Sequence, residues 1–172
     1  EDFLREFHRH RVGFSYNEMS GRYTTLLPLF YTPDTARRLV NAGTSMRPEF
    51  EGGTDYQRAL VKEGDFEIRQ AAWDVYEARL EAGIAKEVAR SVLPVSTYSQ
   101  MYVTLNARSL MSFISLRTDA RTHGVPDAVE RGLPVSRPQR EIELVAEKLE
   151  AEFAKLMPHT HASFVANGRV AP

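Results

Sequence analysis

A four-residue repeat of apolar side chains in the middle of the chain restricts the possible folds more than any other feature. Within residues 55–91 an apolar residue recurs at every fourth position, at Ile68, Ala72, Tyr76, Leu80, Ile84 and Val88. This spacing places the side chains on one slowly drifting face of an α-helix. It predicts a long helix over 55–91, kinked or divided at Gly83 and ended by Pro94.

Shorter helices are expected on both sides of this segment. Residues 32–43 carry helix start and stop signals, and Asn106 is suited to cap a helix over 106–117. An amphipathic pattern predicts a further helix over 139–157, and residues 1–11 are also typical of a helix.

Two segments are expected to form strands. Residues 22–33 are rich in β-branched and aromatic residues, although Pro28 favours an edge position or a bend. Residues 97–105 alternate between apolar and polar side chains, as a strand does. Irregular backbone or loop is expected at Gly13, Asn17 and Gly21, over 44–54 and over 122–138.

Composition narrows the class of protein. The chain has 172 residues, 42% of them hydrophobic, which is enough for one domain with a sizeable core. We therefore expect a single α+β domain over residues 1–172, with a central antiparallel sheet packed with long helices. The net charge is −1, from 22 basic and 23 acidic residues, which gives no reason to expect nucleic-acid or membrane binding.

The absence of cysteine excludes disulfides, thiolate metal sites and cysteine nucleophiles. No apolar run approaches the length of a transmembrane helix, and we expect a cytoplasmic protein. The sequence begins in charged, helix-like residues without Met, so we expect that an N-terminal segment is missing.

The stretch RHRVGFSYNEMSGRY concentrates basic side chains at its start. Arg9, His10 and Arg11 suit an anion, because arginine offers a planar fork of donors that matches phosphate oxygens. A helix end with solvated charges, followed by a turn, explains the same residues about as well.

The second half of this stretch, NEMSGR, is suited to hold a nucleotide. The Ser20 hydroxyl, the Gly21 N–H and the Arg22 guanidinium together match a phosphate cradle. Glu18 is suited to accept from a ribose hydroxyl or a base N–H.

Arg117 is the second basic residue in an informative position. It follows Leu110, Phe113 and Ile114 at the helical spacing 0, 3, 4, 7, so it extends an apolar stripe and should point inward or into a cleft. An unpaired buried guanidinium is costly, so Arg117 needs a partner. An internal salt bridge with a carboxylate such as Asp119 is the commoner outcome for one such arginine.

Two further signals are weaker. Arg90 lies near the end of the long predicted helix, where a cation suits the helix dipole. The pairs His8/His10 and His159/His161 have i, i+2 spacing, which does not bring side chains together on a helix. We therefore expect no metal site.

The stretch RHRVGFSYNEMSGRY resembles the signature of flavin-dependent thymidylate synthases, in which an Arg-His-Arg triplet precedes a Ser-Gly-Arg-Tyr segment. ARSVLP, NARSL, LR and PQREIE follow in the family's order and rough spacing, so the resemblance covers about Glu6 to Ile142. It implies a homotetramer that converts dUMP to dTMP with FAD, NADPH and methylenetetrahydrofolate. Its active sites would combine residues from several subunits.

The resemblance also implies roles for single residues. Contacts to FAD are implied for Arg9, His10, Arg11, Glu18, Asn106, Arg108 and Ser112. Contacts to dUMP are implied for Arg9, Glu18, Met19, Ser20, Gly21, Arg22, Arg90 and Arg117, with Arg90 reaching dUMP from a neighbouring subunit. Arg117 would be the catalytic arginine that polarises the uracil ring. We assign Ser20 to phosphate binding, because an unactivated serine is a weak nucleophile.

Two of the departures of this chain from the family pattern lie at or near the Arg-His-Arg triplet. Eight residues, Val12 to Met19, separate the triplet from the serine, one more than the family usually has, and we expect a bulge near Gly13. Glu6 stands where a glutamine is common. Two alternatives to an active enzyme stay open: a catalytically silent flavin- or nucleotide-binding protein of the same fold, and a helical interaction protein with salt-bridged arginines.

Overall fold

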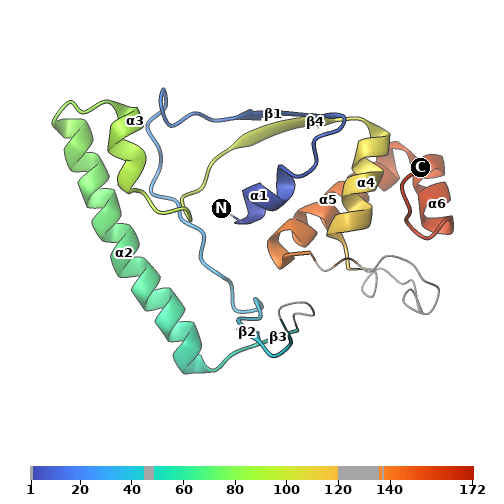
Figure 1. Ribbon diagram of the computed structural model, residues 1–172, viewed down its shortest axis with the longest axis horizontal. Helices are drawn as coiled ribbons and strands as arrows, with labels where there is room; N and C mark the ends of the chain where they lie inside the picture. The colour runs from blue at the N-terminus through green and yellow to red at the C-terminus, as the bar shows by residue number, and fades with distance from the viewer. Residues whose placement is uncertain (1, 45–48, 120–135, 137) are drawn as a thin grey trace. The chain divides into compact units, whose positions relative to one another are not determined.

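The computed structural model describes residues 2–44, 49–119, 136 and 138–172 (Figure 1). The chain divides into two compact units, one formed by Glu1–Asn17 with Tyr102–Pro172 and the other by Glu18–Met101. Helices and short strands both occur along the chain, which confirms the α+β class. The expectation of a single domain stays a prediction.

The first unit is mainly helical. It contains α1 (Asp2–Phe7), β1 (Phe14–Glu18), β4 (Met101–Leu105), α4 (Ala107–Arg117), α5 (Arg140–Leu156) and α6 (Pro158–Ala166), except that Glu18 and Met101 fall in the second unit. Strands β1 and β4 pair with each other. Helix α5 packs against α1, α4 and α6.

Two groups of side chains hold the first unit together. The core between α4, α5 and α6 contains Met111, Ile114, Phe153 and Phe164. A second, aromatic group joins α1 to β1 and α4, because the Phe7 ring lies 5.0 Å from the Phe113 ring and 6.4 Å from the Phe14 ring. Burial of each such side chain stabilises the fold by roughly 1.5–3 kcal/mol. The aromatic group fixes the point at which the chain leaves α1.

The second unit is built on one long helix. Its elements are β2 (Val40–Asn41), β3 (Phe50–Glu51), α2 (Asp55–Glu81), α3 (Lys86–Ala89) and the 3₁₀-helix η1 (Arg90–Val92). Strands β2 and β3 pair antiparallel. The Thr54 side chain accepts from the Gln57 N–H, and the Gln57 side chain accepts from the Thr54 N–H, which is a capping box at the start of α2. Trp73, Tyr76 and Ala89 form the core of this unit.

The long predicted helix is confirmed over 55–81, and its predicted division at Gly83 is confirmed as well. Gly83 has a φ of 77°, in the left-handed region that glycine adopts at low cost, and the helix ends there. The chain restarts as α3 and η1. Ala72 and Tyr76 of the predicted apolar face are buried, whereas Ile68 and Val88 are 66% and 54% exposed in this single chain.

The predicted strand over 22–33 is wrong. Pro28 has no N–H to donate to a sheet, and the Leu29 N–H instead bonds to the Leu27 carbonyl across it at 2.7 Å. Only Phe30 forms a bridge, to Thr97, in the described part of this segment. Leu26 and Phe30 pack irregularly against the core around Trp73.

The predicted helix over 32–43 is also wrong. The Asp34 carboxylate accepts from the Ala36 and Arg37 N–H groups at 2.9 and 2.8 Å and closes a tight turn. Val40 and Asn41 then pair with β3. The segment that was expected to begin a helix after Thr32 and Pro33 therefore forms a turn.

Other differences concern short elements. Strand β1 occupies residues expected to be irregular, and α6 occupies the tail. The helices over 106–117 and 139–157 are confirmed within one residue at each end, and the helix over 1–11 is confirmed only over Asp2–Phe7. Instead of a central sheet, the described residues form two separate two-stranded sheets. Most of the loop over 122–138 lies outside the described residues.

Candidate functional site

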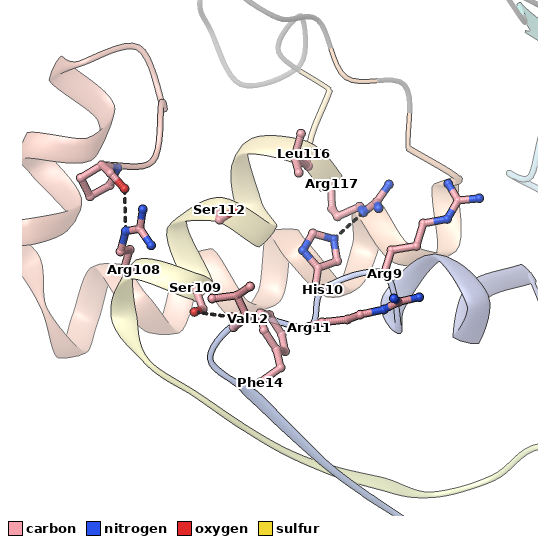
Figure 2. A pocket seen from close by; sticks show the side chains of 11 residues that line it. Arg9, His10, Arg11, Val12, Phe14, Arg108, Ser109, Ser112, Leu116 and Arg117 are labelled. Atoms are coloured by element: carbon pink, nitrogen blue, oxygen red, sulfur yellow. Dashed lines mark hydrogen bonds between the residues drawn. The ribbon is translucent and has the colours of Figure 1, made fainter.

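A pocket of about 280 Å³ lies in the first unit, beside α4 and the segment that follows α1 (Figure 2). It is lined by Arg9, His10, Arg11, Val12, Phe14, Arg108, Ser109, Ser112, Leu116, Arg117 and Pro172. Four of these side chains are arginines. Such a lining favours an anionic ligand with phosphate or carboxylate groups.

The Arg-His-Arg triplet enters the pocket because of how α1 ends. Phe7 is 5% exposed and anchors the last turn of α1 on Phe113. The chain then leaves the helix, so that Arg9 and Arg11 are exposed beside the pocket while His10 is 8% exposed. Figure 2 shows the side chains of Arg9 and Arg11 extending from this segment.

Arg117 projects into the same pocket from the C-terminal end of α4. Its Nη1 forms an ion pair with Glu6 Oε1, and its Nε donates to His10 Nε2 at 2.9 Å. The Arg117 and Glu6 side chains are 12% and 16% exposed. The partner is therefore Glu6, 111 positions away, and not Asp119 as the local sequence suggested. Burial lowers the pKa of Arg117, and the Glu6 carboxylate opposes that shift.

His10 is held as a neutral hydrogen-bond acceptor. Burial first, and then the positive charge of Arg117, lower its pKa from 6.5 to about 4. Its ring lies edge-on to Phe113 with centroids 4.8 Å apart. A neutral ring with its proton on Nδ1 leaves Nε2 free to accept from Arg117, so His10 orients the guanidinium that the pocket presents.

This arrangement predicts a pH dependence of stability. Because the folded-state pKa of His10 is about 4 and its ordinary value is 6.5, the unfolded chain binds a proton first as the pH falls. The contribution of His10 to the free energy of unfolding should be fully present above pH 6.5 and should be lost as the pH falls from 6.5 to about 4. Chemical denaturation of His10→Gln, which keeps an acceptor but does not titrate, should show less of this loss. A pH profile identical to that of the unsubstituted protein would contradict the assignment.

The remaining residues implied for FAD binding are only partly gathered in the pocket. Arg108 and Ser112 line it. Asn106 lies outside the lining, and its side chain caps α4 by accepting from the Ser109 N–H at 2.9 Å, as its sequence position predicted. Glu18 ends β1 with an exposed side chain and is also outside the lining.

The second unit holds most of the residues implied for nucleotide binding, whereas Arg9 and Arg117 line the pocket of the first unit. Gly21 is buried, and a Cβ added there would lie 3.2 Å from both Cδ and Nη1 of Arg90. Arg22 Nε forms a 2.7 Å ion pair with Glu87. The Ser20 carbonyl accepts from the Tyr23 N–H at 3.1 Å and so closes a turn. The turn that contains Gly21 therefore lies beside Arg90 of the same chain. Met19 precedes this turn, and its N–H donates to the Gln100 carbonyl.

Comparison with known proteins identifies the family of this chain. The family model described as thymidylate synthase complementing protein matches residues 2–159. Flavin-dependent thymidylate synthases from Streptomyces coelicolor and Tropheryma whipplei are 54% and 50% identical over 169 residues, which is 98% of this chain. The chain belongs to the flavin-dependent thymidylate synthase family.

A solved structure is also similar to this chain. A crystal structure described as a UMP/dUMP methylase, PolB, from Streptomyces cacaoi bound with 5-Br UMP superposes with a TM-score of 0.88 at 45% identity. The match covers 99% of this chain and 72% of that one. Against the curated family members from Streptomyces coelicolor and Streptomyces avermitilis, the chain spans about 65% of their length.

Several residues that contact the pocket or the turn at Gly21 were not singled out as site residues by sequence reasoning. Glu6 was noted only as a departure from a common glutamine, yet it pairs with Arg117. Ser109 donates to the Val12 carbonyl at 2.8 Å, and Glu87 pairs with Arg22. Pro172 lines the pocket. No local pattern marks these residues, because each contact joins distant parts of the chain.

The described residues contain neither a metal-binding cluster nor a membrane-spanning helix. They contain no cluster of three or more His, Asp or Glu side chains that could hold a metal ion. They also contain no helix with the length and apolar character needed to cross a membrane.

Proposed function

We propose that the protein is a flavin-dependent thymidylate synthase that converts dUMP to dTMP. In this proposal methylenetetrahydrofolate provides the carbon unit, and FAD reduced by NADPH provides the hydride. The observation that carries the proposal is the pocket, in which the Arg-His-Arg triplet meets Arg117 of α4. Family membership and the dUMP-related neighbour support it.

The donors in the pocket fit part of an FAD molecule. The guanidinium groups of Arg9, Arg11 and Arg108 suit a pyrophosphate, and the Ser112 side chain adds a neutral polar group. The volume of about 280 Å³ lies at the lower end of the roughly 300–1,000 Å³ typical of ligand pockets, so it would hold part of the cofactor. Arg9, Arg11 and Arg108 would hold that part. Bound FAD would supply the redox chemistry, and the protein would orient it.

The nucleotide would bind at the turn from Ser20 to Arg22. The Arg22 Nε is taken by Glu87, which leaves the two Nη groups to meet phosphate oxygens. Arg90 lies against Gly21 of the same chain. Whichever subunit provides Ser20 and Gly21 to an active site would therefore provide Arg90 as well, in a homotetramer whose sites combine several subunits.

Arg117 would act on the uracil ring. Hydride delivery to the ring requires that the negative charge developing on it be stabilised. A guanidinium that is already oriented by Glu6 and His10, and shielded from water, provides this stabilisation without reorganising during the reaction. Glu6 also offsets one positive charge where several arginines meet.

The first test is the visible absorbance spectrum of the purified protein before and after adding dUMP, and separately UMP. A flavin band that shifts with dUMP, followed by dTMP formation with NADPH and methylenetetrahydrofolate, would support the proposal. A shift without turnover would favour the silent flavin- and nucleotide-binding alternative. A protein that takes up no FAD and does not respond to dUMP would contradict both.

Replacement of Ser20 distinguishes a binding role from a nucleophilic one. Ser20→Ala should weaken dUMP binding by about tenfold, because one hydrogen bond to a charged phosphate is lost, while turnover at saturating dUMP stays measurable. Isothermal titration gives the affinity and an NADPH-oxidation assay gives kcat. Complete loss of turnover with unchanged dUMP affinity would assign Ser20 to the chemistry instead.

A further inference from the structure

The residues that follow α6, here called the C-terminal segment (167–172), turn back sharply. Gly168 and Arg169 both have a positive φ, 71° and 59°, which is uncommon for an arginine. Their N–H groups donate to the Val165 and Phe164 carbonyls at 3.0 and 2.9 Å, so the helix end is closed and the chain reverses direction.

A buried ion pair anchors this reversal. Arg169 Nη1 pairs with Glu150 Oε1 of α5, and the two side chains are only 14% and 9% exposed. His161 Nε2 lies 3.0 Å from the same oxygen. Among the described residues, Glu150 Oε2 and Arg169 Nε have no hydrogen-bond partner. A buried pair that is incompletely satisfied adds little net stability, so stability alone does not account for it.

The segment leads from this anchor to the pocket. Ala171 packs against the core that contains Met111 and Phe153. The main-chain oxygen of Pro172 then accepts from Arg108 Nε at 2.7 Å, the contact drawn at Arg108 in Figure 2, and Pro172 itself lines the pocket. Within the described residues this contact occupies only Nε of Arg108, which leaves its Nη groups for a ligand.

We propose that Glu150 and Arg169 are positioning residues of the flavin site. By anchoring the C-terminal segment they place Pro172, and Pro172 orients Arg108 toward the anionic part of the bound FAD. The inference rests on the proposed function and extends it to residues beyond the signature stretch. The match to the family model ends at residue 159, so the C-terminal segment lies beyond the matched residues.

A double-mutant cycle on FAD affinity tests the proposal, with Arg169→Met and Arg108→Ala alone and combined in the full chain. FAD titration followed by flavin fluorescence gives each Kd. Arg169→Met should weaken FAD binding by roughly three- to tenfold, because Arg108 loses its preorganised position. In the Arg108→Ala background the same substitution should have no further effect. Arg169→Lys, which keeps the charge opposite Glu150, should restore most of the affinity.

The control is Lys155→Met, which breaks an exposed 2.6 Å ion pair with Glu152 on the same helix and should leave the Kd unchanged. If Arg169→Met does not fold, the Glu150→Gln/Arg169→Met double variant, which removes both buried charges, replaces it in the cycle. Hydrogen exchange of the unsubstituted protein is a second readout, and FAD should slow exchange at Val170 and Ala171.

The outcomes separate this proposal from the proposed function. FAD uptake that is insensitive to Arg169, or equal losses with and without Arg108, would overturn the positioning role alone. An unsubstituted protein that takes up no FAD would overturn the flavin site itself, and the positioning role with it.

Discussion

Arg117→Ala should lower kcat for dTMP formation by roughly 10²–10³-fold, the loss typical when a preorganised donor to developing charge is removed. FAD should stay bound, because Arg9, Arg11 and Arg108 still line the pocket. Turnover is measured by NADPH oxidation and dTMP formation at saturating dUMP, and FAD content by absorbance of the purified variant.

Arg117→Lys should recover little of this loss. A lysine ammonium keeps the charge but cannot donate from a planar fork to His10 and Glu6 at once. Because Arg117→Ala leaves Glu6 buried beside the site without its partner, the Glu6→Gln/Arg117→Ala double variant is needed to separate catalysis from stability. The control is Arg140→Ala, which breaks ion pairs to Glu143 and Glu147 outside the pocket. Turnover of Arg117→Ala near the unsubstituted rate would refute the electrostatic role.

Gly13→Ala should be the most damaging small substitution at the pocket. Gly13 has a φ of 70°, and a Cβ there would lie 2.5 Å from Asn106 Nδ2 and even closer to Ser109 Oγ. The left-handed backbone costs an alanine about 1–2 kcal/mol. The clash adds to this cost, because Asn106 caps α4 and Ser109 holds the Val12 carbonyl. We expect a total loss of roughly 3 kcal/mol or more of unfolding free energy, together with weaker FAD binding.

Gly83→Ala separates backbone strain from the clash. Gly83 has a similar φ of 77°, but a Cβ there would meet nothing within 4 Å. Gly83→Ala should therefore lower the free energy of unfolding only by the backbone contribution of about 1 kcal/mol, and FAD binding should be unchanged. Chemical denaturation of both variants makes the comparison. Equal losses for the two glycines would show that the close approach of Gly13 to α4 is not important.

Local signals were enough for several elements. The helices over 106–117 and 139–157 have an apolar periodicity or a capping residue that acts within one or two turns, and both are confirmed. The sequence prediction was wrong where a short-range pattern is compatible with two local structures. The segment after Thr32 and Pro33 forms a turn closed by Asp34 instead of a helix, and Leu26 and Phe30 on either side of Pro28 pack against the core around Trp73 without forming the predicted strand. Strand β1 had a usable signal, since Phe14 and Tyr16 alternate with exposed residues.

The signature stretch and the positions of its arginines could be read from the sequence, and they were sufficient to indicate the family. The sequence also indicated that Arg117 must have a partner, because its helical spacing places a charge on an apolar face. These conclusions depend on residue type and on spacing within a few positions, which the chain carries whatever its tertiary fold.

Only the tertiary structure decided which groups meet. Arg117 pairs with Glu6 across 111 positions and with His10 across 107, and Pro172 reaches Arg108 across 64. Such pairs form where packing brings desolvated charges together, and the free energy that selects them comes from the whole core around Phe7 and Phe113. No spacing rule encodes that selection, so the ion pairs of Glu6 with Arg117 and of Glu150 with Arg169 are known only from the fold.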